Sequence, residues 1–361
     1  MHDELSPEDS FRLNVLLTQD LKAVRIDESG MKLFALTAQG EASMPLHPNC
    51  RPEQYLRRVR EVLAGHALGS PAGYPVHLSR WTRHGQMDSA NLGRLLLTGE
   101  PEAVVAVAHS PALTDEIAAH AWWVLPSIEH ATLMLSRRVV AEGRMGPVLA
   151  GFLIEHLPFL HDDHVSIMDT VAVLLYSGAL TEAQREAVWR RGRARNTYYV
   201  TFLQMCPDNL PAPLPARADH ATCEAALGAL SADNPLARML LRCLSAPGQT
   251  YLWAVNEILG RPEVQEVVNN TFRAIREYFA PLRELDPEAA SSARAEVLAT
   301  CPQLDNECDA VLALARVSEA ESREVFARTT AIGSLMRRKI EPLTTPLLAH
   351  VKALRGACQG G

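Results

Sequence analysis

The chain of 361 residues has 47% hydrophobic and 21% charged side chains, a composition typical of a globular protein and not of a disordered one. Its formal net charge of −7 argues against wholesale nucleic-acid binding, which usually requires a basic domain. Seven cysteines with scattered spacings form no disulfide framework. The acidic first 25 residues do not resemble a signal peptide, and no run of about 18 uncharged apolar residues could span a membrane. We therefore expect a cytoplasmic protein that does not bind a membrane.

The N-terminal region mixes helix and strand signals. A helix is predicted over 7–17, because Ser6 can cap it and Pro7 suits its first turn. An amphipathic helix is predicted over 51–63, ended by glycines. Short strands bounded by turn sequences are expected at 23–27, 31–37, 42–46 and 74–83. Residues 1–88 are therefore predicted to form a small α+β cap.

A short phrase occurs twice in the middle of the chain. Ser110-Pro-Ala-Leu-Thr-Asp115 returns 67 residues later as Ser177-Gly-Ala-Leu-Thr-Glu182. Thr114 and Thr181 are each predicted to cap a helix, and Thr181 forms a capping box with Gln184. The offset equals about two solenoid repeats of roughly 33–40 residues. The phrase predicts a mainly α fold, an α–α superhelix of HEAT-like helical hairpins behind the α+β cap.

Beyond residue 88, helical segments alternate with short loops, as antiparallel neighbours require. The predicted parts are a helical repeat domain at 89–206, a proline-rich linker at 207–217, a C-terminal helical domain at 218–355 and a flexible tail at 356–361. A helix over 318–338 should open with a capping box of Ser318 and Glu321. The basic run 337–339 is interpreted as a complement to the dipole at the end of that helix, and a last helix is expected over 342–354.

Known enzyme signatures are absent from the sequence. It contains no nucleophile elbow, no phosphate-binding loop and no His-Glu-x-x-His zinc motif, so we expect a non-enzymatic protein without a cofactor. The densest group of possible zinc or iron ligands comprises His156, His161, Asp162, Asp163 and His164. Either aspartate also suits the N-cap of the next helix, which is the favoured interpretation. Metal binding by the three histidines stays open.

Residues 51–94 form a basic region, with seven arginines and three acidic residues. Aromatic side chains lie among the arginines, a pattern that could bind an RNA loop or an acidic protein surface. An ordinary solvated face is the alternative. The candidate contact residues are Arg57, Arg58, Arg60, Arg80, Trp81 and Arg83.

Three segments of the N-terminal half, 49–60, 68–86 and 99–107, resemble the DsrS family. Its members are soluble proteins encoded beside the reverse-acting dissimilatory sulfite reductase of sulfur-oxidising bacteria. The resemblance implies an accessory or regulatory role in the oxidation of stored sulfur, and it supplies no catalytic residues. We therefore expect a non-catalytic scaffold that binds a protein partner of the sulfur-oxidation machinery. The sequence does not indicate which protein this is, nor the oligomeric state.

Two alternatives remain from the sequence. The first is post-transcriptional regulation through RNA bound at the basic cap. The second is sulfur carriage by Cys358, whose glycine-rich surroundings leave its backbone unrestrained. Other sulfur-trafficking proteins present a cysteine on such an arm, and Lys352 and Arg355 could lower the pKa of this thiol. A frayed tail that happens to hold a cysteine is the competing interpretation.

Overall fold

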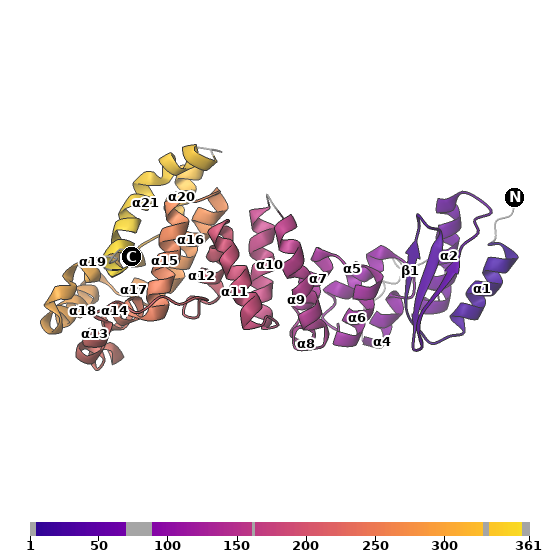
Figure 1. Cartoon of the computed structure of the whole chain (residues 1–361), viewed down its shortest axis with the longest axis horizontal. Coiled ribbons are helices and arrows are strands. Elements are labelled where there is room, and N and C mark those ends of the chain that lie inside the picture. Colours follow the sequence, from indigo (N-terminus) through magenta and orange to yellow (C-terminus); the bar gives the residue numbers. More distant parts are fainter. Residues whose placement is uncertain (1–4, 70–88, 161–162, 328–331, 356–361) are drawn as a thin grey trace. The chain divides into compact units, whose positions relative to one another are not determined.

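The computed structural model of the chain describes residues 5–69, 89–160, 163–327 and 332–355. This part of the chain is mainly helical, with a three-stranded antiparallel sheet near the N-terminus (Figure 1), as predicted. The contacts between residues divide the chain into two compact units. Unit 1 comprises residues 1–156 and 176–179, and unit 2 comprises 157–175 and 180–361.

The sheet of unit 1 has the strand order β1-β2-β3, formed by Leu21–Asp27, Lys32–Thr37 and Gly40–Pro45. Helices α1 (Pro7–Leu17) and α2 (Pro52–Leu68) share a buried apolar core with the strands, in which Val24, Leu33 and Tyr55 are fully buried. Helix α1 has the predicted bounds. Helix α2 extends past its predicted end at residue 63, because Gly65 is accommodated within the helix and the left-handed cap falls at Gly69.

The other face of the sheet contacts α4 (Ser89–Leu95) and α6 (Asp115–Val124). The guanidinium group of Arg25 lies 4.8 Å from the Phe34 ring centre and 5.0 Å from that of Trp123. Trp123 Nε1 also donates to Glu41 Oε2 at 3.0 Å. The sheet and the helices that follow residue 88 thus belong to one unit. The strand predicted at 74–83 lies outside the described residues.

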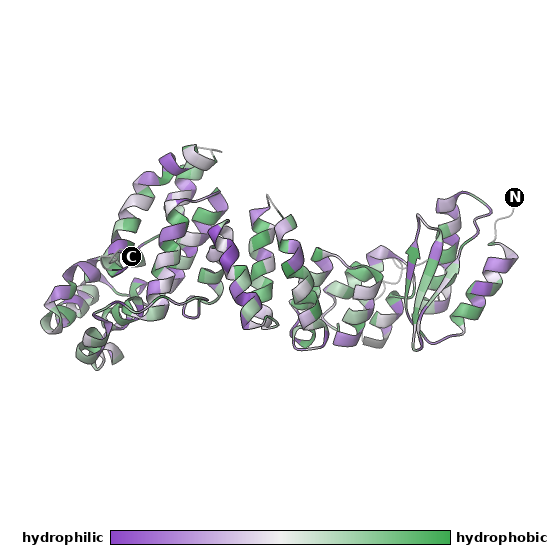
Figure 2. Ribbon diagram, viewed as in Figure 1, coloured by the Kyte–Doolittle hydropathy of each residue, from purple (hydrophilic) through white to green (hydrophobic). Residues whose placement is uncertain are grey.

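Neighbouring helices along the chain pack on one another in unit 1: α5 contacts α6 and α7, and α7 contacts α8 and α9. The remaining helices of this unit are α5 (Pro101–His109), α7 (Ile128–Leu135), α8 (Arg138–Ala141) and α9 (Met145–His156). Helix α9 is mostly hydrophobic (Figure 2), and it buries Leu149 and Leu153. Helix α11 of unit 2, by contrast, is largely hydrophilic and buries Val188 and Trp189.

The repeated phrase adopts the same local structure in both copies. Ser110 Oγ accepts the amide two residues on, and Thr114 Oγ1 accepts the amide three residues on, each at 3.2 Å. Ser177 and Thr181 form the same two bonds, also at 3.2 Å. The predicted caps of α6 and α11 are therefore confirmed, and the capping box of Thr181 with Gln184 is present. Both phrases connect two helices. Their hydroxyl oxygens accept backbone amides that would otherwise lack a carbonyl partner at the end of one helix and the start of the next.

Unit 2 is built of helices and short 3₁₀ turns. Its elements are η1 (Leu157–Phe159), α10 (His164–Ser177, whose last two residues belong to unit 1), α11 (Glu182–Arg190), η2 (Arg191–Arg193), α12 (Thr197–Met205), α13 (His220–Leu227), η3 (Leu230–Ala232), α14 (Pro235–Leu244), α15 (Ala246–Gly260), α16 (Gln265–Tyr278), α17 (Ala280–Arg283), α18 (Pro287–Thr300), η4 (Pro302–Leu304), α19 (Asp305–Ala315), α20 (Glu319–Phe326) and α21 (Gly333–Arg355). The predicted linker, 207–217, contains no helix or strand, in line with its prolines. Hydrogen bonds attach it to unit 2, from the Leu214 amide to Thr250 Oγ1 and from the Arg217 amide to the Leu244 carbonyl.

Two predicted helix boundaries near the C-terminus are wrong. The expected helix over 318–338 is divided between α20 and α21, and Ser318 caps α20 by accepting from the Ala320 amide instead of forming a box with Glu321. The helix expected to begin at residue 342 is part of α21, which contains Pro342 and Pro346. Each internal proline removes a backbone bond, but both are exposed, and burial of the opposite face of α21 offsets this cost.

Asn234, the buried N-cap of α14, provides a test of the packing in unit 2. Its Oδ1 accepts the amides of Leu236 and Ala237 at 3.0 Å, while Nδ2 donates to the Ala293 carbonyl at 3.0 Å and to Glu296 Oε2 at 2.9 Å. Asn234→Ala is expected to lower the free energy of unfolding by about 2 kcal/mol, because it removes a cap and leaves buried partners unsatisfied. Urea denaturation followed by circular dichroism measures this loss.

The matched control is Asp286→Ala, at the exposed N-cap of α18. Its carboxylate accepts one amide, that of Ala289 at 2.7 Å, so the expected loss is about 1 kcal/mol. Equal losses in the two variants would show that the buried bonds of Asn234 add nothing to its role as a cap.

Candidate functional site

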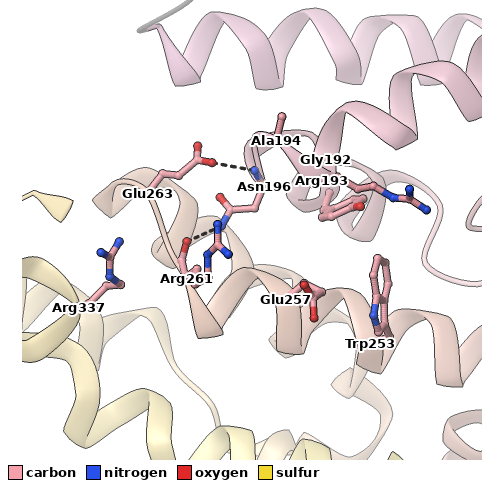
Figure 3. A pocket seen from close by; sticks show the side chains of 10 residues that line it. Gly192, Arg193, Ala194, Asn196, Trp253, Glu257, Arg261, Glu263 and Arg337 are labelled. Atoms are coloured by element: carbon pink, nitrogen blue, oxygen red, sulfur yellow. Dashed lines mark hydrogen bonds between the residues drawn. The ribbon is translucent and has the colours of Figure 1, made fainter. Parts of the chain in front are cut away.

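A cavity of about 410 Å³ in unit 2 lies among the start of α12, the C-terminal half of α15 and the first turns of α21 (Figure 3). Side chains far apart in sequence surround it. Its lining residues are Gly192, Arg193, Ala194, Asn196, Tyr199, Trp253, Glu257, Arg261, Glu263 and Arg337.

One wall of the cavity is aromatic. The Tyr199 ring lies 4.4 Å from Trp189 and 5.5 Å, edge to face, from Trp253, measured between ring centres. Gly192 packs directly on this wall, since a Cβ added there would lie 2.3 Å from the Tyr199 ring. A larger residue would displace the ring, so glycine is needed here for close packing. Tyr199 is buried, whereas Trp253 is half-buried and retains surface toward the cavity.

Hydrogen bonds fix the segment between α15 and α16 to the start of α12. Asn196 Nδ2 donates to the Arg261 carbonyl at 2.8 Å, and the Asn196 amide donates to Glu263 Oε1 at 3.0 Å (Figure 3). Glu263 Oε2 accepts from Thr197 Oγ1 at 3.3 Å, and His164 Nδ1 lies 2.7 Å from the same hydroxyl. The carboxylate of Glu263 is therefore engaged within the protein. The hydrogen bond from Asn196 to the Arg261 carbonyl holds the backbone of Arg261 at the cavity.

The cavity is rich in cationic side chains. Arg193 ends η2, Arg261 follows α15 and Arg337 lies near the beginning of α21; all three are exposed. Within the described ranges, no carboxylate forms an ion pair with any of these arginines. Burial raises the pKa of Tyr199, an effect that Arg193 opposes and Glu257 reinforces. The tyrosine hydroxyl is therefore neutral at physiological pH, and the charged groups of the lining are the three arginines and the carboxylates of Glu257 and Glu263.

This arrangement suits binding. Planar guanidinium groups bind carboxylate or phosphate in a fork geometry, and the Trp253 face can pack on an apolar or planar group. Among the described lining residues there is no serine, cysteine, histidine or lysine; of the two lining carboxylates, Glu263 is engaged by Asn196 and Thr197, and Glu257 is exposed. The guanidinium and aromatic groups make the cavity a candidate binding site for an anionic ligand with an apolar part.

The candidate residues of the basic cap lie mostly in α2. Arg57 pairs with Glu61 at 3.0 Å, one turn along the same helix. Arg60 is half-buried and pairs with Glu28 at 2.5 Å, and Arg58 is also half-buried. Arg57 and Arg60 thus hold acidic side chains of the protein itself. Arg80, Trp81 and Arg83 lie outside the described residues.

The histidines of the possible metal group have separate surroundings. His156 Nδ1 lies 2.8 Å from the Phe152 carbonyl oxygen and its ring stacks on that of Phe152, whereas His164 is engaged with the start of α12. Asp163 accepts the Ser166 amide at 2.9 Å, as the cap interpretation predicts. Over the described ranges, no three His, Cys, Asp or Glu side chains are grouped so as to hold a metal ion. His161, Asp162 and Cys358 lie outside these ranges.

The sequence analysis missed the cavity. Arg337 was assigned to the C-terminal end of a helix, but it lies near the N-terminal end of α21, so the dipole interpretation of residues 337–339 is wrong. One available signal was the run 190–195, in which four of six residues are arginine and which immediately precedes α12.

No protein-family model matches this chain, and no curated protein or solved structure matches it either. None of the helices that the structure describes combines the length and the apolar character needed to cross a bilayer.

Proposed function

We propose that this chain is a non-catalytic accessory protein of dissimilatory sulfur oxidation, which acts in the cytoplasm and binds a protein partner through a superhelix of helical hairpins. The observation that carries the proposal is the repeated connection at Ser110–Thr114 and Ser177–Thr181, which makes the same hydrogen bonds 67 residues apart. Stacked helical repeats present extended surfaces that bind other macromolecules. The assignment to sulfur oxidation rests on the resemblance of 49–60, 68–86 and 99–107 to the DsrS family.

Packing in unit 1 supports the repeat architecture, because α5 contacts α6 and α7, and α7 contacts α8 and α9, so helices close in sequence are close in space. In unit 2, α11 contacts α12, while α12 also contacts α15 and α16, which follow α13 and α14 in the chain. The cavity supports binding over catalysis, because its described lining offers guanidinium and aromatic groups. The ion pairs of Arg57 and Arg60 reduce the positive charge that α2 could offer to RNA, which favours a protein partner.

Capture of the full-length chain from sulfur-grown cells tests this proposal. The tagged protein is cross-linked in the cells, purified with and without ribonuclease, and analysed by mass spectrometry. A protein that co-purifies despite ribonuclease, and that binds the purified chain in isothermal titration calorimetry, is the expected result. Recovery of only a small molecule or a metal would overturn the scaffold proposal. Retention that ribonuclease abolishes would support the RNA alternative, and a sulfur adduct on Cys358 would support the carrier.

A further inference from the structure

We infer that the cavity bounded by Arg193, Arg261 and Arg337 receives an acidic peptide segment of the partner protein. Carboxylates of the segment bind the guanidinium groups, and an aromatic side chain packs on Trp253. This inference rests on the proposed partner-binding function, and it specifies the site and the chemistry of the partner.

The positively charged side chains that line the cavity indicate that its ligand carries carboxylates. Three arginines from three separate elements meet at one cavity without an acidic partner among the described residues. Some other arginines of unit 2 hold a carboxylate of the protein, as in the pair Arg242–Asp208 at 2.7 Å. A guanidinium group without an acidic partner can bind a carboxylate of another molecule through two parallel N–H···O bonds.

The two carboxylates that line the cavity favour a peptide over a polyphosphate as its ligand. Glu263 is occupied by the amide of Asn196 and the hydroxyl of Thr197. Glu257 is exposed and lines the cavity between Trp253 and Arg261 (Figure 3). A carboxylate in this position disfavours the densely charged backbone of RNA or a nucleotide triphosphate. It can accept an N–H group of a peptide backbone, because each peptide unit carries one such donor.

The aromatic wall and the size of the cavity indicate that the bound segment includes an aromatic side chain. Trp253 is supported from behind by Trp189 and Tyr199, so its free surface is held in place. An aromatic side chain that packs on such a ring gains about 0.5–1.5 kcal/mol beyond the area that it buries. The volume of about 410 Å³ lies within the range of roughly 300–1,000 Å³ usual for ligand sites.

Selection from a library of random dodecapeptides displayed on phage, with the full-length chain as target, tests the inference. We expect enrichment of sequences that combine aspartate or glutamate with an aromatic residue. Binding of labelled copies of these peptides is then measured by fluorescence anisotropy on Arg261→Glu and Arg337→Glu. Each charge reversal is expected to weaken binding at least tenfold, and Trp253→Leu several-fold. The matched control is Arg276→Glu, an exposed arginine of α16 that does not line the cavity, and it should leave the affinity unchanged.

Three outcomes overturn the inference. Acidic peptides that bind all variants equally would place the acidic site elsewhere and leave the scaffold function standing. Enrichment of no peptide, or only of peptides without acidic residues, would remove the acidic-segment idea. Binding of inorganic phosphate, ATP or single-stranded RNA that requires Arg261 and Arg337 would make this a phosphate site. Circular dichroism spectra identical to that of the wild type ensure that each variant is folded.

Discussion

Asp9→Ala is expected to lower the free energy of unfolding of unit 1 by about 3–4 kcal/mol, because three donors lose a buried carboxylate. Asp9 is 1% exposed. Its carboxylate accepts the Tyr55 hydroxyl and the His47 amide, the latter at 2.7 Å, and lies 3.0 Å from Nδ1 of the same histidine. These bonds join α1 to α2 and to the segment after β3. Glu8→Ala is the control, since Glu8 is exposed, pairs with the exposed Arg12 at 2.6 Å and should contribute less than about 1 kcal/mol.

The pH dependence of this loss identifies its cause. Burial alone would raise the pKa of Asp9, but hydrogen bonds from Tyr55 and His47 together lower it below its ordinary value of 3.8. Because the folded pKa is the lower one, the carboxylate contributes its full stability above pH 3.8, and this contribution is lost as the pH falls through the folded pKa. The difference in unfolding free energy between the wild type and Asp9→Asn should therefore shrink below about pH 4. A difference unchanged at pH 3 would show that shape, and not charge, accounts for the effect.

Local features of this fold follow from the sequence because they depend on residues close in the chain. Ser6 caps α1 and Thr181 caps α11, since a hydroxyl needs only the amide three residues on. The network around Asp9 was not predicted, because it requires Tyr55, 46 residues away, to meet the same carboxylate. Single-sequence patterns carry no signal for such a pair.

Near the C-terminus, a strong local signal predicted a helix boundary that tertiary packing does not allow. Pro342 is typical of a helix start, and this placed a boundary inside α21. Met336, Ile340 and Val351 are buried on one face across that boundary, so packing favours one continuous helix. The same error hid the cavity, because it placed Arg337 at the wrong end of a helix.

Arg217→Met is expected to lower the free energy of unfolding of unit 2 by about 3–5 kcal/mol, the cost of removing one partner from a buried ion pair. The guanidinium group is about one-tenth exposed and binds both oxygens of Asp219 at 2.7 Å and Glu307 Oε1 at 2.8 Å. It also donates to the carbonyls of Ala353 and Leu354 at 3.3 and 3.5 Å, in the last turn of α21. These carbonyls have no amide partner within the helix, so side chains replace one: Arg217 serves both carbonyls, and Gln249 Nε2 also donates to that of Leu354 at 3.2 Å. Urea denaturation gives the loss.

Amide hydrogen exchange in the last turn of α21 reports the same change locally, because the methionine variant lacks the donors that hold this helix end. Arg294→Met is the matched control, since Arg294 also binds α19, through Asp305 and Asp309, but at a site where both acids are exposed. It should cost less than about 1 kcal/mol. Equal losses in the two variants would contradict a special role for Arg217.

The double variant Arg217→Met/Glu307→Gln separates the ion pair from the carbonyl contacts. If most of the loss comes from leaving the largely buried Glu307 carboxylate without its cation, neutralising Glu307 restores part of the stability. Fast exchange at the end of α21 should persist in the double variant, because glutamine at 307 does not replace the donors to Ala353 and Leu354. Recovery of both stability and protection would mean that the ion pair alone fixes this helix end, and that the carbonyl bonds contribute nothing.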